Sequence, residues 1–252
     1  MIDLLLVGIG AGNPKHLTLE AIEALNSADV ILIPRKGAGK DDLAELRRVI
    51  CRDYLTNGGP PQHEFDLPVR DPATPDYVQR VNDWHDAIAT AWQEAITSQV
   101  GSSGRVAFLV WGDPSLYDST LRIAERVQSK LALQLTVIPG ITSIQALTAG
   151  HAIPLNTLAA PVTITTGRKL RDFGWPPKTE SLVVMLDAGG AFEVLDKEGY
   201  DIWWSAFAGM PQEIRIAGPL SEVQAHILET RAKARADHGW IMDVYLIRKR
   251  DT

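Results

Sequence analysis

The segment Gly112-Asp113-Pro114 follows a strongly apolar stretch and combines residue types that suit a ligand site. Gly112 would let the backbone approach a ligand closely, and Asp113 could accept hydrogen bonds from an amine or from hydroxyl groups. Pro114 has no backbone N–H and fixes the turn. The same residues also suit a helix start, with Asp113 as the N-terminal cap and Pro114 as the first helical residue. The local sequence leaves ligand contact and helix capping both open.

Two other glycine-containing loops follow apolar runs in the same way. The first is Gly8-Ile9-Gly10-Ala11-Gly12, and the second is Pro139-Gly140-Ile141 followed by Thr142 and Ser143. The hydroxyl groups of Thr142 and Ser143 could contact a ligand, or they could cap the helix that follows.

The first glycine loop invites comparison with a dinucleotide-binding fingerprint. That fingerprint requires glycine at its sixth position, where this chain has Asn13, and an acidic residue after the second strand, where it has Pro34-Arg35-Lys36. These differences argue against a nicotinamide-dependent oxidoreductase. A tight strand-to-helix turn that uses glycine for positive φ is the simpler interpretation.

Strand-length apolar runs alternate with helical periodicity through the first 150 or so residues, which predicts a doubly wound, mostly parallel α/β sheet. Because ligands bind beyond the carboxyl ends of parallel strands, the three glycine loops should lie along one edge of that sheet. The expected strands are Ile2–Val7, Val30–Ile33, His63–Leu67, Arg105–Trp111 and Leu133–Ile138, and the expected helices include Asp41–Tyr54, Asp76–Ser98, Leu116–Lys130 and Thr142–Gly150.

The pattern changes near Ile153–Ala160, after which strands predominate. Ile202–Phe207 and Glu213–Ala217 lie too close together for a crossover helix, so they should form an antiparallel hairpin. We also expect a helix at about Gly190–Glu198. The sequence thus predicts two α/β domains, residues 1–152 with the parallel sheet and residues 153–252 with a mixed sheet.

Composition excludes several classes of protein. The chain has 252 residues, 45% hydrophobic and 22% charged, as in an ordinary globular enzyme, and its net charge of −6 argues against a general nucleic-acid binder. The single cysteine, Cys51, is either a nucleophile or a passenger on a helix, and the six histidines show no metal-ligand spacing. No apolar run is long enough to cross a membrane, and no signal-peptide pattern precedes the first strand. We expect a cytoplasmic protein with no metal, membrane or nucleic-acid partner.

The three loops, taken in order with Leu17-Thr18, Tyr117, Val184-Met185-Leu186 and Gly218-Pro219-Leu220, resemble the tetrapyrrole (corrin/porphyrin) methyltransferase family. The resemblance spans nearly the whole chain. It implies S-adenosyl-L-methionine as the cofactor, bound in a cleft between two α/β domains and converted to S-adenosyl-L-homocysteine. It also implies a small-molecule tetrapyrrole substrate and a homodimer.

Carried over by motif, the resemblance implies cofactor contacts in both domains. The chain departs from the usual pattern at Ala11, where relatives carry proline, and at Trp240-Ile241-Met242, where many carry small residues. The implied cofactor-binding residues are Gly10, Ala11, Gly112, Asp113, Pro114, Thr142, Ser143, Met185, Ala208 and Ile241.

Within the family, the resemblance is strongest to C-methyltransferases of cobalamin (corrin) biosynthesis that methylate C-1 of precorrin-5 and release acetate, giving precorrin-6A. Loss of acetate would use a general base or a positioned water, for which Asp113, Tyr117 and Asp187 are candidates. Asp187 could equally cap the helix expected after Gly190. Alternatives are another corrinoid or uroporphyrinogen methyltransferase, a diphthine-type or ribosomal-RNA methyltransferase, and a ligand-binding module without turnover.

The tetrapyrrole substrate would carry many carboxylates, and two basic clusters could bind them. The first cluster is Arg35 and Lys36, after the second strand. The second contains Arg168 and Lys169, after the strand Val162–Thr166. Surface charges are often simply solvated, so these residues could also have no partner in the substrate.

Overall fold

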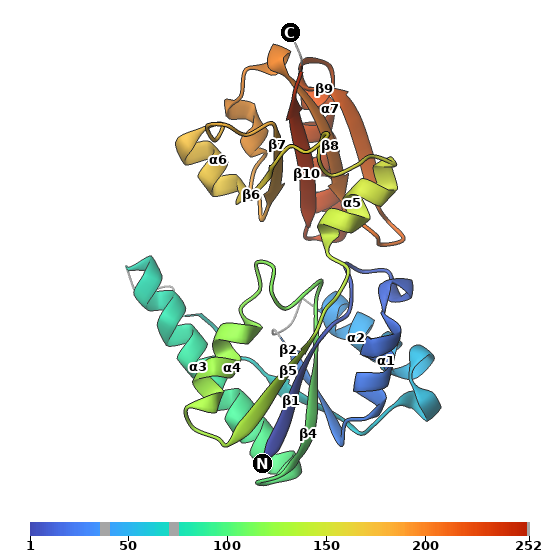
Figure 1. Cartoon of the computed structure of the whole chain (residues 1–252), viewed down its shortest axis with the longest axis vertical. Coiled ribbons are helices and arrows are strands. Elements are labelled where there is room, and N and C mark those ends of the chain that lie inside the picture. Colours follow the sequence, from blue (N-terminus) through green and yellow to red (C-terminus); the bar gives the residue numbers. More distant parts are fainter. Residues whose placement is uncertain (36–40, 71–75, 251–252) are drawn as a thin grey trace. The chain divides into compact units, whose positions relative to one another are not determined.

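The computed structural model describes residues 1–35, 41–70 and 76–250. The chain divides into two compact units, Met1–Ile141 and Thr142–Thr252 (Figure 1). We expected the division at residues 152 and 153, after the helix α5 (Ser143–His151). The contact pattern places it before α5, because this helix packs on strands of the second unit.

A five-stranded sheet forms the centre of the first unit. Its strands follow the order β3-β2-β4-β1-β5, and every neighbouring pair is parallel. This confirms the parallel α/β architecture predicted from the alternating pattern. The strands are β1 (Ile2–Gly8), β2 (Val30–Arg35), β3 (Gln62–Asp66), β4 (Gly104–Val110) and β5 (Leu133–Ile138).

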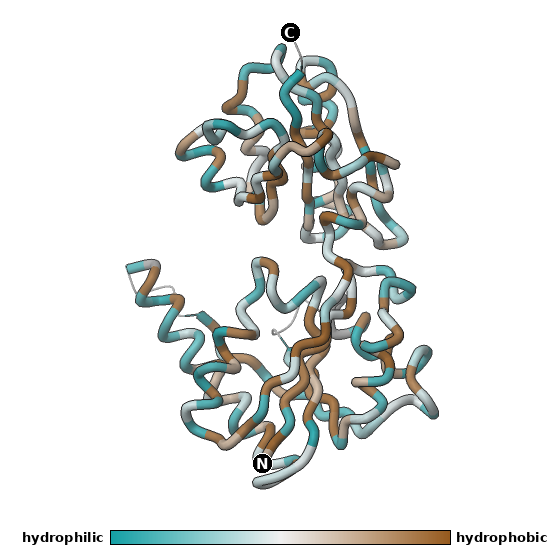
Figure 2. The backbone as a smooth tube through the Cα atoms, viewed as in Figure 1, coloured by the Kyte–Doolittle hydropathy of each residue, from teal (hydrophilic) through white to brown (hydrophobic). Residues whose placement is uncertain are grey.

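Helices cover both faces of this sheet, α1 and α2 on one side and α3 and α4 on the other (Figure 1). Alternate residues of β1 serve the two layers: Leu4 and Leu6 pack toward α3 and α4, and Leu5 and Val7 toward α1 and α2. Figure 2 shows the resulting concentration of apolar residues along the strands. The helices are α1 (Leu19–Asn26), α2 (Asp41–Tyr54), α3 (Tyr77–Val100) and α4 (Thr120–Gln128), with short 3-10 turns η1 (Pro14–His16) and η2 (Thr56–Gly58).

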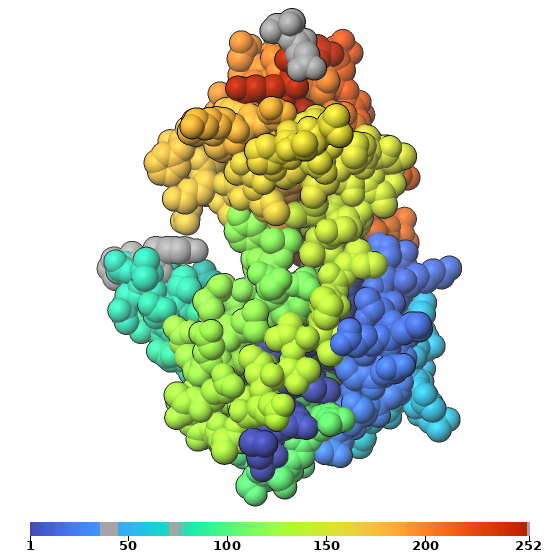
Figure 3. Space-filling view, viewed as in Figure 1, coloured from blue at the N-terminus to red at the C-terminus, as the bar shows by residue number. Residues whose placement is uncertain are grey.

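Helix α4 begins at Thr120, later than the expected start at Leu116. The backbone of Tyr117 is in the left-handed region, with φ of 50°, which is incompatible with a helical turn there. The Asp118 carboxylate then accepts a hydrogen bond from the Thr120 amide at 2.7 Å. A loop of nine residues, 111–119, therefore separates β4 from α4. In the space-filling view of Figure 3, green and yellow-green atoms from the middle of the chain cover much of the visible face of the first unit.

The second unit contains a mixed sheet, as predicted. Its order is β6-β7-β10-β8-β9; only the β6–β7 pair is parallel, and β8 and β9 form the expected antiparallel hairpin. The elements, besides α5, are β6 (Val162–Thr166), α6 (Gly167–Phe173), β7 (Ser181–Met185), β8 (Tyr200–Ala206), β9 (Ile214–Pro219), α7 (Leu220–His238) and β10 (Asp243–Lys249).

The helix expected at Gly190–Glu198 was a wrong prediction. Two 3-10 turns, η3 (Ala191–Val194) and η4 (Lys197–Gly199), replace it. Leu195 and Asp196 adopt extended backbone angles between them, so no continuous helix forms.

Among the described residues, no helix combines the length and the apolar character needed to cross a membrane.

Candidate functional site

The three glycine loops meet at the carboxyl edge of the first sheet. Gly10 and Gly112 exchange two backbone hydrogen bonds, of 3.3 Å from the Gly10 amide and 2.9 Å from the Gly112 amide. The Gly140 amide donates to the Asp113 carboxylate at 2.8 Å. Segments more than 100 residues apart in sequence thus form one continuous backbone surface, as the strand order predicts.

This close approach requires glycine. A Cβ on Gly8 would lie 2.6 Å from the Gly140 nitrogen, and a Cβ on Gly140 would overlap the Gly112 carbonyl oxygen. Both obstacles are backbone atoms, which cannot rotate away as a side chain could. The three loops therefore depend on one another for their positions.

Gly112 leaves unoccupied space beside its backbone, although the residue itself is buried. Its φ of +66° favours glycine, yet no heavy atom lies within 4 Å of the place a Cβ would occupy. A side chain at this position would fill that space.

Asp113 is hydrogen-bonded within its own loop and to the third loop, and does not cap α4. Its carboxylate accepts hydrogen bonds from the Ser115 amide at 2.8 Å, from the Ser115 hydroxyl and from the Gly140 amide. Burial opposes ionisation of Asp113, but the hydrogen bonds from Ser115 and Gly140 outweigh it and lower the pKa. Asp113 is thus a carboxylate that joins the second loop to the third.

The third loop leads into α5, and the Thr142 hydroxyl caps this helix, one of the two roles that the sequence left open for it. The Thr142 side chain accepts a hydrogen bond from the Ile144 amide at 3.1 Å, and Gln145 completes a capping box. Ser143 is the first helical residue and is partly buried. In the first two loops, Ala11 and Pro114 are buried.

The predicted contacts of the second unit also lie at one edge of a sheet. Strands β7 and β8 both pair antiparallel with β10, so they run in the same direction. Met185 ends β7, Ala208 follows the end of β8, and Ile241 precedes β10. The Phe207 amide donates to the Met242 carbonyl at 2.8 Å, which ties the last two segments together. The structure thus brings Met185, Ala208 and Ile241 to the same edge.

Asp187 has a structural role. Its buried carboxylate accepts hydrogen bonds from the Gly189 and Ala191 amides at 3.1 and 2.6 Å, and from Tyr245 and Arg171, both at 2.8 Å. Burial opposes its ionisation, but these four donors together lower its pKa. Ala191 is the first residue of η3, so Asp187 caps the turn after Gly190, the alternative the sequence had left open.

The predicted basic clusters differ in their surroundings. Arg35 is paired with Asp66 at 3.0 Å and lies 3.7 Å from Glu64, so neighbouring carboxylates compensate its charge. Lys36 lies outside the described residues. Arg168 and Lys169 lie in the first turn of α6. The Lys169 ammonium lies 4.8 Å from the centre of the Phe173 ring.

Cys51 behaves as a core residue. It is fully buried on α2, and burial raises the pKa of its thiol to about 11. A thiol with this pKa is almost entirely protonated at neutral pH and is a poor nucleophile. The described residues contain no group of three or more His, Cys, Asp or Glu side chains placed to hold a metal ion.

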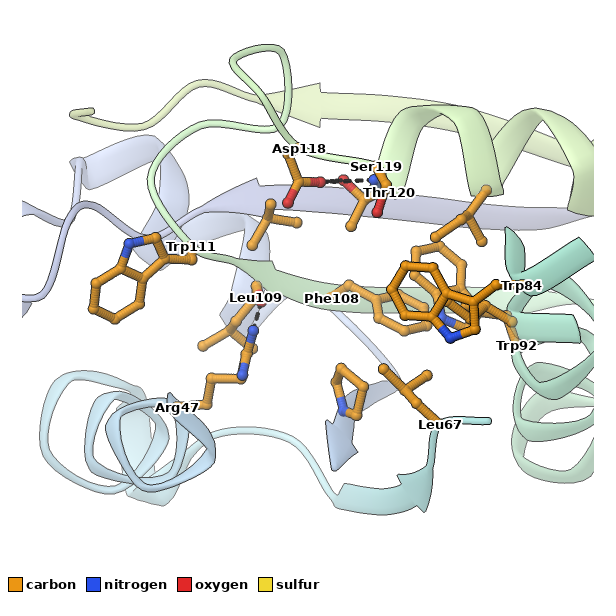
Figure 4. A pocket seen from close by; sticks show the side chains of 14 residues that line it. Arg47, Leu67, Trp84, Trp92, Phe108, Leu109, Trp111, Asp118, Ser119 and Thr120 are labelled. Carbon is orange, nitrogen blue, oxygen red and sulfur yellow. Dashed lines mark hydrogen bonds between the residues drawn. The ribbon is translucent and has the colours of Figure 1, made fainter. Parts of the chain in front are cut away.

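The sequence reasoning missed a cavity at the carboxyl ends of β2 and β4. Its volume is about 130 Å³, and Figure 4 shows its lining side chains. Arg47 of α2, Trp111 after β4, and Asp118 before α4 contribute to its walls. The polar and aromatic residues of the loop 111–119 could have indicated this cavity from the sequence. Arg47 could not, because it reaches the cavity only when α2 folds against the sheet.

Comparison with known proteins agrees with this architecture. Residues 3–224 match the family of Tetrapyrrole (Corrin/Porphyrin) Methylases. The chain belongs to this family. It is also 51% identical, over 251 residues, to a protein of Sinorhizobium sp. named precorrin-6A synthase [deacetylating], covering 99% of this chain and 96% of the relative.

Two solved structures extend the comparison. A cobalamin synthesis related protein (CobF) of Corynebacterium diphtheriae is 38% identical, with a TM-score of 0.85 and full coverage of both chains. A uroporphyrin-III C-methyl transferase of Thermus thermophilus, crystallised with S-adenosyl homocysteine, is 19% identical, with a TM-score of 0.59 and coverage of 98% and 97%. The second likeness concerns the fold alone.

Proposed function

We propose that this member of the family is an S-adenosylmethionine-dependent C-methyltransferase of corrin biosynthesis with precorrin-6A synthase (deacetylating) activity. It would methylate C-1 of precorrin-5 with loss of acetate, giving precorrin-6A. The observation that carries the proposal is the 51% identity to the Sinorhizobium precorrin-6A synthase over 99% of the chain. The meeting of the three glycine loops at one edge supports it independently.

The cofactor-binding residues proposed are those predicted from the sequence. In the first unit, Gly112 offers open space against its backbone, and Gly10 bonds directly to it. Asp113 acts there by holding the loops in register. In the second unit, Met185, Ala208 and Ile241 share one edge of the sheet. Ala11, Pro114, Thr142 and Ser143 complete the proposed set.

S-adenosylmethionine would supply a methyl group already activated by a sulfonium centre. Transfer of such a group is an in-line displacement, so the protein contributes chiefly by orienting the reactants and excluding water. The rigid backbone surface around Gly112 suits this role, because glycine contacts and hydrogen bonds fix it from three loops.

Loss of acetate requires a group that can bind or move a proton. Asp113 and Asp187 each accept several hydrogen bonds that favour the ionised carboxylate, which makes both poor bases. Tyr117 lies in the loop 111–119 with 42% of its surface exposed. We therefore propose Tyr117 as the side chain that positions the acetyl group or the attacking water.

Incubation with methyl-labelled S-adenosylmethionine and precorrin-5, followed by mass analysis and an acetate assay, tests the proposal. We expect one labelled methyl group per product and one equivalent of acetate. A Gly112→Val variant, whose side chain fills the open space, should lose activity. The matched variant Gly199→Ala, where no heavy atom lies within 4 Å of the new Cβ, should retain it.

Other outcomes identify the alternatives. Methylation without acetate would indicate a corrinoid or uroporphyrinogen methyltransferase acting at another position. Thermal stabilisation by NADPH but not by S-adenosylhomocysteine would refute the methyltransferase proposal altogether. A cytoplasmic homodimer is part of the same proposal, and light scattering of the purified protein would test the dimer.

A further inference from the structure

Two exposed arginine side chains lie at the carboxyl edge of the first sheet, outside the glycine loops. Arg70 follows β3, and Arg122 lies in the first turn of α4, directly after the loop 111–119. Only β2 separates β3 from β4 in the sheet. The ends of β3 and β4 are therefore two strand spacings, about 10 Å, apart. A macrocycle that lies along this edge extends over both strand ends.

An aromatic side chain holds Arg70 in place. The guanidinium of Arg70 lies 4.4 Å from the centre of the Trp84 ring, within the range of a cation–π interaction. The Trp84 indole in turn donates to the Pro68 carbonyl at 2.8 Å. Figure 4 shows Trp84 beside the cavity that the start of α4 also lines. A cation–π contact uses the charge of Arg70 and not its N–H groups, so these donors remain available to an acceptor.

The loop before α4 holds Arg122. The Nη2 of Arg122 donates to the backbone carbonyl of Asp118 at 2.7 Å. The Asp118 carboxylate accepts instead from the amide and hydroxyl of Thr120, at 2.7 and 2.5 Å. A cation in the first turn of a helix opposes the helix dipole, so the charge of Arg122 does not stabilise α4. The position of this arginine therefore calls for another explanation.

A third arginine joins the two helices that carry these side chains. Arg126 of α4 donates to Asp86 and Asn82 of α3, at 2.7 and 3.0 Å. These hydrogen bonds fix α4 against α3. The Arg122 side chain therefore has a defined position relative to Trp84 and to the guanidinium that Trp84 holds.

The charges of the three arginines act on one buried side chain of α3. Burial is the largest influence that lowers the pKa of His85, and the positive charges of Arg126, Arg122 and Arg70 lower it further. Asp86 opposes them and is paired with Arg126. Arg70 and Arg122 form no ion pair with a carboxylate in the part of the chain that the structure describes. Two uncompensated cations thus lie in one region of a chain whose net charge is −6, and an anionic ligand would relieve their repulsion.

We propose that Arg70 and Arg122 bind two carboxylate arms of the acidic tetrapyrrole, with Trp84 holding Arg70 in position. This inference rests on the proposed function for the identity of the substrate. Guanidinium groups match the geometry of carboxylates, and both arginines lie at the edge of the sheet where ligands of parallel sheets bind. Arg35, which the sequence suggested for this role, is already paired with Asp66.

Uroporphyrin, a fluorescent tetrapyrrole with eight carboxylates, is the probe for a test that needs no cofactor. Fluorescence titration of the full chain should show saturable binding that weakens as salt is added, because exposed ion pairs are screened. Arg70→Gln and Arg122→Gln should each weaken binding about fivefold, the upper range for an exposed ion pair, and the double variant about 25-fold. Arg235→Gln, which removes an exposed arginine of α7 in the second unit, is the control and should bind as the wild type does.

Two further measurements distinguish lost charge from altered structure. Arg70→Lys and Arg122→Lys keep the charge and should bind more tightly than the glutamine variants. The binding that remains in the double glutamine variant should depend less on salt than that of the wild type. Failure of the wild type to bind uroporphyrin, unchanged binding by the double glutamine variant, or equal weakening by Arg235→Gln would overturn the inference.

Turnover separates this inference from the proposed function. If the chain methylates precorrin-5, the double glutamine variant should raise the KM for the tetrapyrrole about 25-fold and leave the KM for S-adenosylmethionine within twofold. Methylation with an unchanged tetrapyrrole KM in that variant would refute the carboxylate contacts and leave the function standing. Uroporphyrin binding that depends on Arg70 and Arg122, without methylation of precorrin-5, would refute the function and leave the site standing.

Discussion

The carboxylate of Asp113 accepts a hydrogen bond from the amide of Gly140, across 27 residues of sequence, at 2.8 Å. This contact joins the loops that follow β4 and β5, two strands that both border β1 in the sheet. It works together with the close packing of Gly140 against the Gly112 carbonyl. The proposed cofactor surface is therefore held by long-range contacts. Substitutions that separate the loops should weaken cofactor binding while the fold is retained.

Gly140→Ala tests the close packing of the loops. The new Cβ would overlap the Gly112 carbonyl oxygen, so the loops must separate. We expect a loss of about 1–3 kcal/mol in the free energy of unfolding, as in overpacked cores, and at least tenfold weaker binding of S-adenosylhomocysteine by calorimetry. Gly199→Ala, which meets no atom within 4 Å, controls for the added methyl group. Wild-type affinity in Gly140→Ala would contradict this account.

Asp113→Asn tests the pH dependence of the loop contact. Hydrogen bonds from Ser115 and Gly140 outweigh burial and lower the pKa of Asp113 below its usual value of 3.8. A pKa lowered by folding stabilises the protein above about pH 4, and this stabilisation is lost as the pH falls toward the lower native value. The stability advantage of wild type over Asp113→Asn should therefore be constant from pH 5 to 7 and shrink below about pH 4.

Urea unfolding between pH 3 and 7 measures that difference. Asp237→Asn, at an exposed position near the end of α7, is the matched control for replacing a carboxylate by an amide. A difference for Asp113→Asn that persists unchanged down to pH 3 would show that the charge of Asp113 is not what the loops depend on.

Much of the fold is predictable because its determinants are local. Apolar runs of strand length, such as Ile2–Val7, indicate strands buried on both faces, and their alternation with helices implies a parallel sheet. Once the sheet is parallel, the glycine loops must gather at its carboxyl edge. The short connection between β8 and β9 likewise fixes an antiparallel hairpin.

The rest depends on partners distant in sequence. From the sequence, Asp113 could be interpreted only as a ligand contact or as a helix cap. Its contact with the Gly140 amide was not predictable, because only the folding of the sheet brings the two residues together. Arg47 reaches the Leu109 carbonyl across 62 residues, so no local pattern marked it. Asp187 was recognisable as a cap, but its bond to Tyr245 and its lowered pKa follow from strand pairing.

The second unit contains a buried ion pair that should be sensitive to the loss of one partner. Arg231 of α7 donates to Asp243 at 2.9 Å, and the Trp204 indole donates to the same oxygen at 3.0 Å. Burial raises the pKa of Asp243, and Arg231 opposes that rise. Arg231→Met leaves the carboxylate buried without its cation, so we expect a loss of about 3–5 kcal/mol in the free energy of unfolding.

A double variant distinguishes this cause from lost packing. Arg231→Met with Asp243→Asn removes both charges, and denaturant unfolding should recover part of the stability lost in the single variant. Arg235→Met, at an exposed position on the same helix, should be close to wild type. If the double variant were less stable than Arg231→Met alone, the unpaired charge would not be the cause.

Tyr117→Phe tests the proposed role in acetate loss. The Tyr117 backbone has a φ of 50°, and phenylalanine tolerates that conformation as tyrosine does, so only the hydroxyl is removed. Burial raises the pKa of Tyr117, which keeps the phenol protonated and able to donate a hydrogen bond at neutral pH. We expect acetate release to slow by about 100-fold, the lower range for a proton-handling group.

Mass analysis and an acetate assay during single turnover would follow methyl transfer and acetate release separately. Tyr200→Phe removes a tyrosine hydroxyl on β8 and should release methylated product and acetate together. Water that attacks the acetyl carbonyl breaks a carbon–carbon bond, and the electron pair of that bond can then attack the methyl group, so slower acetate loss in Tyr117→Phe should slow methyl transfer with it. Equal, wild-type rates of both steps in Tyr117→Phe would therefore exclude its hydroxyl from the reaction and direct attention to a water held by the backbone of the loop 111–119.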